Sequence, residues 1–434
     1  MKHLFFLLLL ILPSIACAQP ALSLDDCIHF AWKQNPQIRN KAIDIKEGRA
    51  DYAASIGAFL PRAVANAETG KRFGRSIDPD TNGYTNDTFE EGTVGLDMTL
   101  SLFEGFSRIN RVRFQKLNRQ HSQWELKDKQ NELAYQVTDA YYKLILERKL
   151  LHLALEQRRL SERYLKQTEI FLELGLKSAS DLQEVKARRE GDIYRYQSRE
   201  NSCRLALLHL KQLMNFQPED TLLVQDTIAE TDKLPFLPVS SAESLYNQSL
   251  QVLPVLRMMD LKIKAARKEY AVAGGAFSPS VYARFTVGSH FYNTAFSARQ
   301  LRDNIGKYIG IGVSFPLLSG LERITHQRKL KLAVYRLRNE EELEKQQLYT
   351  GIEQTLLSLR SGYQEHQQAS LQLEAEARVL KESERKWEEG LISVFQLMEA
   401  RNRFIAAKAE LIRVRLQVEM MRKLEKYYRE GTFL

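Results

Sequence analysis

The 434-residue sequence has few cysteines and no long apolar segment beyond its first residues. Of its three cysteines only Cys27 and Cys203 follow residue 18, and two cysteines in so long a chain do not make a disulfide framework. No run of 18 or more apolar residues occurs, so no transmembrane helix is predicted. The eight histidines are scattered, without HxxxH or CxxC spacing, so we expect no catalytic, cofactor-binding or metal-binding site.

The sequence also lacks any basic block. Its net charge is +9, but Lys and Arg alternate with Glu and Asp, as in RNEEELEKQQ at 338–347. This pattern is typical of solvated helical faces and argues against nucleic-acid binding.

The first residues read as a secretory signal peptide over residues 1–18. Lys2 and His3 precede an apolar stretch at 4–12, and Ala16-Cys17-Ala18 provides small residues for cleavage before Gln19. A lipoprotein signal with an acylated Cys17 is the alternative, although Ser14 would then occupy a position that usually carries a branched apolar residue. In both cases the mature chain is exported.

The sequence contains an internal duplication. DYAASIGAFLP at 51–61 aligns with EYAVAGGAFSP at 269–279, an offset of 218 residues, because Pro279 falls on Pro61. Two later blocks repeat at an offset of 215 residues, so that Val94 falls on Ile309 and Leu174 on Glu389. We therefore predict a first repeat at 19–217, a connector at 218–239 that is punctuated by Pro218, Pro235 and Pro238, and a second repeat at 240–434.

Each repeat predicts an opening helix, two strands and two long helices. The opening helices are expected at 24–58 and 242–276. The strands are expected at about 62–73, 93–102, 280–291 and 307–317, where apolar and polar residues alternate, as Val94, Leu96 and Met98 do with Gly95 and Asp97. Each strand has about the length that a tilted strand needs to cross a bilayer. A soluble sandwich also has alternating strands, but it has no use for the long helices that follow.

Proline is absent from residues 106–217 and 321–434, which predicts long helices. Gly175 and Gly390 interrupt them at matching positions, so each first arm would be about 105 Å long at 1.5 Å per residue. The return arms are expected to reach about Phe216 and Tyr428. An apolar series with coiled-coil spacing includes Leu397, Ala400, Phe404, Ala407, Leu411, Val414, Val418 and Met421. Most of these residues are expected to pack within the chain. The expected fold class is α+β.

Four strands from two hairpins cannot close on themselves in lipid, where open sheet edges are not tolerated. We therefore expect closure by cyclic oligomerisation. Three copies would supply twelve strands, which is enough for a barrel with a lumen. The strand count alone does not distinguish a trimer from a dimer or a tetramer.

The duplicated plan, the strand ends such as VGLDMTLSLFEG and the turns such as LGLKSASDLQEVKA resemble the TolC family of outer-membrane efflux proteins over essentially the whole mature chain. The resemblance implies a homotrimer in outer-membrane lipid. Its twelve-stranded β-barrel would be continuous with an α-helical barrel in the periplasm. It also implies two partners, a periplasmic adaptor (membrane fusion) protein and an inner-membrane transporter.

The resemblance also assigns residues. Adaptor-docking tips would fall at Leu174, Gly175 and Leu176 and at Glu389, Gly390 and Leu391, although the glycines could instead serve only to make the turns. Periplasmic entrance-gate positions would fall at Gln396, Glu399 and Asp181. An amide at position 396 replaces one acidic ring of the family, which should weaken cation selectivity. The positions of the family's latch partners for Asp181 carry Ile392 and Trp387 here.

The expected function is a passive outer-membrane exit duct of a tripartite efflux pump or a type I secretion system. The alternative is a non-conducting coiled-coil scaffold of the envelope, and a weaker third hypothesis is a periplasmic enzyme on a helical scaffold. A scaffold has no need of four alternating strands with one face free of charge. The transported substrate is not predicted, because specificity in such systems lies mostly in the inner-membrane transporter.

Overall fold

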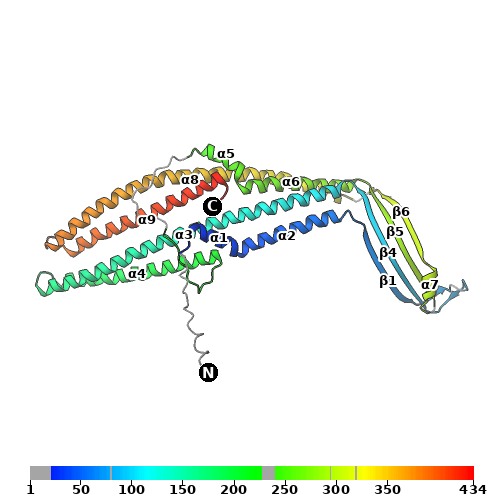
Figure 1. Ribbon diagram of the computed structural model, residues 1–434, viewed down its shortest axis with the longest axis horizontal. Helices are drawn as coiled ribbons and strands as arrows, with labels where there is room; N and C mark the ends of the chain where they lie inside the picture. The colour runs from blue at the N-terminus through cyan, green and yellow to red at the C-terminus, as the bar shows by residue number, and fades with distance from the viewer. Residues whose placement is uncertain (1–20, 79–80, 227–239, 294, 318–319) are drawn as a thin grey trace, which may run out of the picture. The chain divides into compact units, whose positions relative to one another are not determined.

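The computed structural model describes residues 21–78, 81–226, 240–293, 295–317 and 320–434 (Figure 1). The predicted signal peptide lies outside these residues, as does the part of the predicted connector from 227 to 239. The described fold is α+β, as expected. Its helices are α1 (Leu24–Gln34), α2 (Pro36–Gly57), α3 (Ser107–Glu173), α4 (Ala179–Met214), α5 (Ala242–Val252), α6 (Pro254–Gly274), η1 (Gly275–Phe277), α7 (Ala298–Asp303), α8 (Glu322–Glu388) and α9 (Val394–Glu430). Its strands are β1 (Arg62–Arg72), β2 (Ser76–Ile77), β3 (Tyr84–Thr85), β4 (Phe89–Glu104), β5 (Ser280–Asn293) and β6 (Gly306–Ser314).

The chain folds as two compact units, and each unit draws on both sequence repeats. Of the described residues, a helical unit contains 21–40, 128–226, 240–253 and 348–434, and a sheet unit contains 41–78, 81–127, 254–293, 295–317 and 320–347. The duplication therefore does not give one folding unit per repeat. Instead, equivalent parts of the two repeats come together in the same unit.

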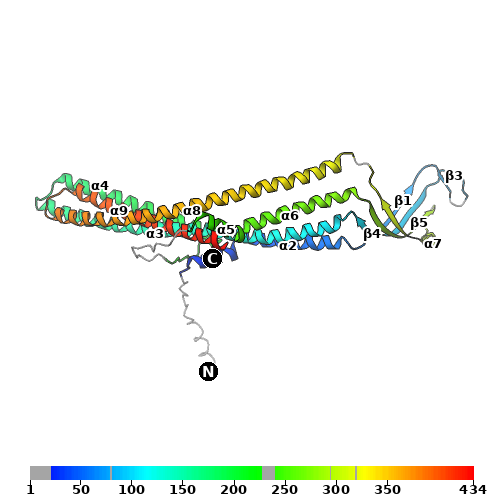
Figure 2. The same ribbon diagram turned by 90° about the horizontal axis from the view of Figure 1, so that it is seen from above.

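The long arms form two helical hairpins, whose turns and return helices belong to the helical unit (Figures 1 and 2). In the first, Arg199 of α4 pairs with Glu147 of α3 at 3.4 Å. In the second, Arg422 Nε of α9 donates to the Tyr363 hydroxyl of α8 over 2.8 Å. The predicted ends of the arms agree with the observed helices to within about two residues. The predicted coiled-coil series is partly a buried seam, and its fully buried members are Leu397, Ala400, Ala407, Val414 and Val418.

The two opening helices, which were each expected to be continuous, are broken. α1 ends before Asn35 and α2 begins at Pro36, and in the second repeat α5 ends before Leu253 and α6 begins at Pro254. Asn35 and Leu253 have extended backbones with ψ of 126° and 130°. A proline ring disfavours the helical conformation in the residue before it, so both prolines separate two helices.

Four strands of the sheet unit form one antiparallel sheet in the order β1-β4-β5-β6, which leaves β1 and β6 at its edges. Strand β4 begins four residues before the expected start at residue 93, because its pairing with β1 extends to Phe89 opposite Arg72. Strand β6 ends at Ser314 rather than at residue 317, because its ladder with β5 ends where Ser280 faces Ser314.

The connections at the sheet end far from the long helices contain short elements that were not predicted. The small β2–β3 ladder lies between β1 and β4, and the six-residue helix α7 lies between β5 and β6. Helix α7 is capped by Ser297, whose hydroxyl accepts a hydrogen bond from the Gln300 amide over 3.2 Å.

Candidate functional site

Both long hairpins reverse direction through the same backbone turn. At the first tip, the amide of Leu176 donates to Phe171 O over 2.8 Å and the amide of Gly175 donates to Leu172 O over 3.0 Å. At the second tip, Leu391 donates to Lys386 O and Gly390 to Trp387 O over the same distances. This pair of hydrogen bonds is a Schellman motif, which needs a left-handed residue after the helix. Gly175 and Gly390 supply it with φ of 74° and 75°.

Apolar side chains are exposed around both turns. Leu174 and Leu176 at the first tip and Leu391 at the second are each about two-thirds exposed. Phe395, in the first turn of α9, is also exposed and was not among the expected tip residues. Exposed large apolar residues that cluster at one end of an element are typical of contact surfaces. The tips therefore combine a fixed turn with an apolar surface.

The structure gives two of the three expected gate residues a local role in starting the return helices. Ser178 caps α4, and its amide and hydroxyl donate to the Asp181 carboxylate over 2.9 and 2.8 Å. Ser393 caps α9, and its amide donates to Gln396 Oε1 over 3.1 Å. Both arrangements are capping boxes. The hydrogen bonds from the backbone and hydroxyl of Ser178 stabilise the ionised carboxylate, so the pKa of Asp181 is lowered.

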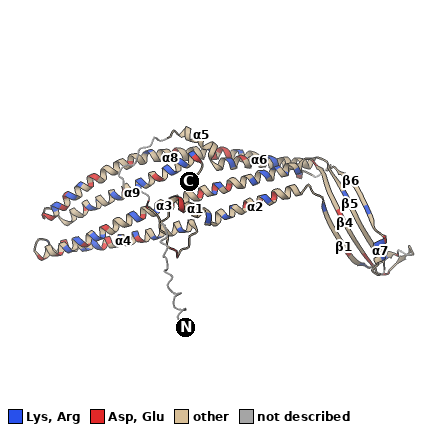
Figure 3. Cartoon of the chain, in the orientation of Figure 1, with Lys and Arg blue, Asp and Glu red and all other residues tan. Residues whose placement is uncertain are grey.

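The third expected gate residue, Glu399, lies on the exposed face of α9 one turn after Gln396. Its carboxylate lies 3.6 Å from Arg403 Nη1, and Arg403 Nε is also 3.5 Å from Glu376 of α8. The Arg403–Glu399 pair is exposed on both sides, so it contributes little to stability. Its effect is electrostatic, because Arg403 partly offsets the negative charge of Glu399. Lys, Arg, Asp and Glu alternate in the same way along the long helices (Figure 3).

The positions expected to partner Asp181 lie in a buried apolar cluster beneath the tips. Trp387 is 2% exposed and packs edge-on against Tyr164, with ring centroids 5.3 Å apart. Val185, Val394, Leu397 and Met398 complete the cluster, and Ile392 packs against it. Trp387 and Ile392 therefore hold the two hairpins together by apolar contact.

A buried polar network lies next to this cluster and was not predicted. Arg401 is 2% exposed, and its Nη2 donates to Gln157 O over 2.8 Å. Asp192 is also buried, accepts the Ser161 hydroxyl and lies 3.2 Å from Arg195 Nη1. Burial lowers the pKa of Arg401. A charged residue inside a helical repeat pattern usually indicates the solvent side, so the sequence contained no signal for this burial.

In the sheet unit, cross-strand registers place apolar side chains in rows on one face. One row runs from Ala63 through Met98 and Phe285 to Ile309. The next row continues through Leu100, Ala283 and Ile311. The face is not covered in the chain, since Ile309 is 82% and Ile311 72% exposed. The alternation that predicted the strands therefore produces one continuous apolar surface, here called the apolar face.

The opposite face of the same sheet is polar. Asp97 accepts a hydrogen bond from the Thr286 hydroxyl over 2.9 Å, and Thr99 lies opposite Arg284. Arg62 and His290 occupy the same face, because each pairs with an odd-numbered residue of β4. The sheet therefore separates a mainly apolar side from a side with charges and hydrogen-bonding groups.

In the part of the chain that the structure describes, no helix has the length and apolar character to cross a membrane.

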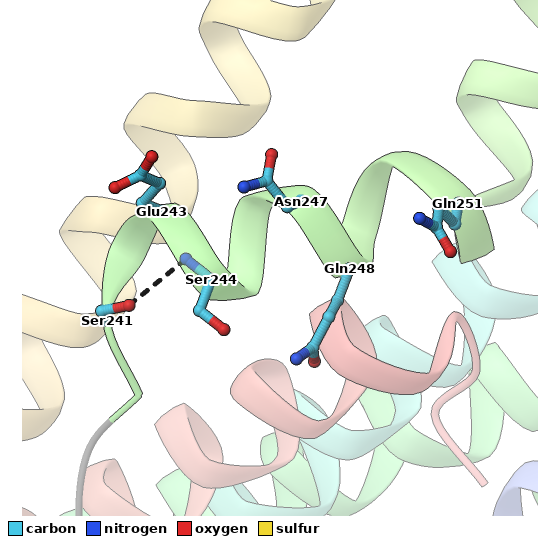
Figure 4. Close-up of a pocket in the computed structure, with 6 residues that line it drawn as sticks. All are labelled: Ser241, Glu243, Ser244, Asn247, Gln248 and Gln251. Atoms are coloured by element: carbon cyan, nitrogen blue, oxygen red, sulfur yellow. Dashed lines mark hydrogen bonds between the residues drawn. The ribbon is translucent and has the colours of Figure 1, made fainter.

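A shallow polar groove of about 450 Å³ lies on α5 in the helical unit (Figure 4). Its lining comes from the cap and one face of that helix: Ser241, Glu243, Ser244, Asn247, Gln248 and Gln251.

The two repeats match the sequence profile of the outer membrane efflux protein family at residues 27–215 and 245–422. The chain belongs to this family, which consists of outer-membrane channels, and its location is the outer membrane. Among curated proteins, it is 25% identical over 321 residues to the alkaline protease secretion protein AprF of Pseudomonas aeruginosa. That match covers 71% of this chain and 64% of AprF, slightly less than two thirds of the relative's length.

Solved structures share the fold at low sequence identity. The CmeC outer membrane channel of Campylobacter jejuni superposes with a TM-score of 0.82 at 14% identity, covering 94% of this chain and 85% of CmeC. The outer membrane protein VceC of Vibrio cholerae gives a TM-score of 0.79 at 13% identity, covering 95% of this chain and 97% of VceC.

Proposed function

We propose that the chain is one protomer of a homotrimeric, passive exit duct in the outer membrane. In this proposal the apolar face of the four-stranded sheet contacts lipid and the polar face lines a water-filled lumen. The observation that carries the proposal is the combination of this uncovered apolar face with two edge strands, β1 and β6. In lipid, each edge would leave backbone groups without partners unless another copy of the chain pairs with it.

The dimensions of the apolar face support a membrane position. From Val94 to Leu102 the β4 strand advances eight residues, about 27 Å along its axis and about 21 Å along the membrane normal at a tilt of ~40°. Outer-membrane barrels have apolar bands of about 25 Å. Three copies would then form a barrel of twelve strands, continuous with a barrel of the long helices in the periplasm.

The duct would act with a periplasmic adaptor and an inner-membrane transporter, which supplies the energy. The exposed leucines at both tips would dock the adaptor, because their turns are fixed while their apolar side chains remain uncovered. The similarity to AprF, which is named as a secretion protein, supports protein export as one cargo class beside small-molecule efflux.

The tips would also form the entrance of the duct. Three Glu399 residues around a threefold axis would favour cations, whereas Gln396 contributes no charge. Three Arg403 residues one turn deeper would weaken that preference. Asp181 belongs to the same entrance, but its hydrogen bonds with Ser178 give it a structural task as well.

The test is planar-bilayer recording on the purified full-length protein. We expect ion conductance from a detergent-requiring oligomer, with a weak preference for cations. Glu399→Lys should shift the reversal potential towards anion preference, and Arg403→Gln should shift it towards cations. Asp139, on α3 far from the tips, provides the control Asp139→Asn, which should leave the potential unchanged. If the reversal potential is unchanged in both tip variants, Glu399 and Arg403 do not line the pore.

The second candidate is the non-conducting envelope scaffold. It is favoured only by the buried seam along the long helices, which any coiled-coil protein also has. If the purified protein is a water-soluble monomer without conductance, the duct hypothesis is contradicted and the scaffold hypothesis remains.

A further inference from the structure

The sheet end far from the long helices carries a short helix that is fixed against the apolar face. The side chain of Ser289 lies on that face, because Ser289 pairs with Val94, and its hydroxyl donates to Leu301 O of α7. The amide of Tyr292 donates to Gln300 Oε1 over 3.0 Å, and Asn304 Nδ2 donates to His290 O over 2.9 Å. Three hydrogen bonds therefore hold α7 at the border of the apolar face.

An aromatic contact reinforces the attachment of this helix. Phe291 is buried on the same face, and its ring leans over Gly92 of the neighbouring strand. The ring of Phe296 meets it edge-on with centroids 5.1 Å apart. The segment between β5 and β6 is thus attached by apolar as well as polar contacts, and α7 occupies a defined place on the sheet (Figure 1).

The exposed residues of α7 and of the adjoining strand are basic. Arg299 and Arg302, three residues apart on α7, have side chains that are 86% and 76% exposed. Lys307, the second residue of β6, lies on the apolar face opposite Val287 and precedes the exposed Ile309 and Ile311. Asp303 is the acidic neighbour of both arginines, at 3.5 and 3.2 Å, so the group keeps a net positive charge. A second outward pair at this end, Lys71 with Glu90, is neutral overall.

The order of apolar and basic residues at this end of the sheet matches the order of the apolar and headgroup layers at a membrane surface. Moving along β6 away from the long helices, the apolar face gives way to a lysine and then to two arginines on a helix that is fixed there. Lysine at such a boundary extends its charged end towards headgroups while its alkyl chain stays in the apolar layer. Guanidinium groups bind phosphate through paired hydrogen bonds.

We propose that Arg299, Arg302 and Lys307 form a binding site for the phosphate groups of lipid A, the anionic glycolipid of the outer leaflet. The site rests on the proposed function, because that function places the apolar face in lipid and the long helices on the periplasmic side. The far end of the sheet then lies at the outer leaflet. The site would fix the depth and rotation of each protomer in the membrane.

The experiment uses the full-length protein in lipid nanodiscs and native mass spectrometry with two probes, diphosphoryl lipid A and the same lipid without phosphates. We expect the wild type to prefer the phosphorylated lipid. Arg299→Gln/Arg302→Gln should weaken its binding by roughly 30-fold, about fivefold for each arginine near an anionic surface. The matched control, Arg62→Gln/Arg284→Gln, removes two arginines from the polar face of the same sheet and should change the binding less than twofold.

Other outcomes overturn the proposal. Equal binding of the two lipids by the wild type, unchanged binding by the α7 variant or an equal loss in the control would each do so. Complete displacement of lipid A by inorganic phosphate at equal phosphate concentration would indicate a site for free anions and would also overturn it. Failure of the proposed function is recognised separately, because the wild-type chain would then not enter nanodiscs or conduct ions at all.

Discussion

The two helix tips have the same backbone turn, but different side chains stabilise it. Gly175 and Gly390 have nearly the same φ, and Ser178 and Ser393 cap the return helices in the same way. The residue three positions after each serine differs, because it is Asp181 at the first tip and Gln396 at the second. The backbone amide of the cap needs only an oxygen acceptor, which a carboxylate and an amide both provide. The geometry of the turn is thus common to both repeats, while its charge is not.

The side chains beneath the tips differ more strongly. Trp387, on the last turn of α8, is fully buried in the cluster with Tyr164 and Met398. Its equivalent in the first repeat is Leu172, at the offset of 215 residues, and that side chain is only half-buried. The second hairpin therefore provides the centre of the cluster, and the first hairpin packs around it.

The largest expected effect tests this asymmetry. Trp387→Ala removes a buried ring and should lower the free energy of unfolding of the helical unit by about 3–5 kcal/mol. Leu172→Ala should cost clearly less, because part of that side chain is already exposed. Chemical denaturation of the purified protein, followed by circular dichroism, measures both. Equal losses of unfolding free energy would show that the two hairpins contribute equally to the stability of the cluster.

The next effect tests the common turn. Gly175→Val and Gly390→Val each place a β-branched residue at a positive φ and should each cost about 1–3 kcal/mol. No heavy atom lies within 4 Å of a Cβ at either position, so the cost is conformational. Gly191→Ala in the interior of α4 is the control and should stabilise by about 0.5–1 kcal/mol. Denaturation curves with clearly unequal losses for the two valine variants would break the equivalence of the tips.

The smallest effect tests the difference in charge. The folded-state pKa of Asp181 is lowered, so its contribution to stability is present above the unfolded pKa of about 3.9 and is lost as the pH falls through the folded pKa. Asp181→Asn should therefore destabilise near pH 7, and the deficit relative to the wild type should disappear in strong acid. Gln396→Glu should give the second tip the same pH dependence. Stability measured at pH 7 and in strong acid for both variants checks this, and a deficit of Asp181→Asn that persists in acid would contradict it.

Strong, repeated patterns allowed most of the fold to be predicted. Alternation in the strands and the absence of proline in the long arms left few alternatives, and the observed β1 and α3 begin within a residue of expectation. The helix breaks at Asn35 and Leu253 were missed because helical composition continues across them, although Pro36 and Pro254 mark both sites. Helix α7 was missed because six residues are too few to show a period.

The local contacts of the candidate site were harder to predict than the fold. The spacing of Ser178 with Asp181 and of Ser393 with Gln396 is a capping-box signature, which the sequence alone could have revealed. The burial of Arg401 could not have been read in this way, because it depends on contacts with Gln157 and Tyr164 from a helix more than 200 residues earlier. Pattern reasoning finds local chemistry and misses polar contacts between distant segments.

The unpaired edges of β1 and β6 also have a consequence for the order of events when the protein is made. A single copy that completed its sheet in lipid would leave two rows of backbone groups unmet, and such a species is prone to irregular association. In the proposed trimer, productive insertion would then require copies to meet before or during entry into the membrane. The yield would depend steeply on their local concentration, and slow synthesis or dilution would favour aggregation over assembly.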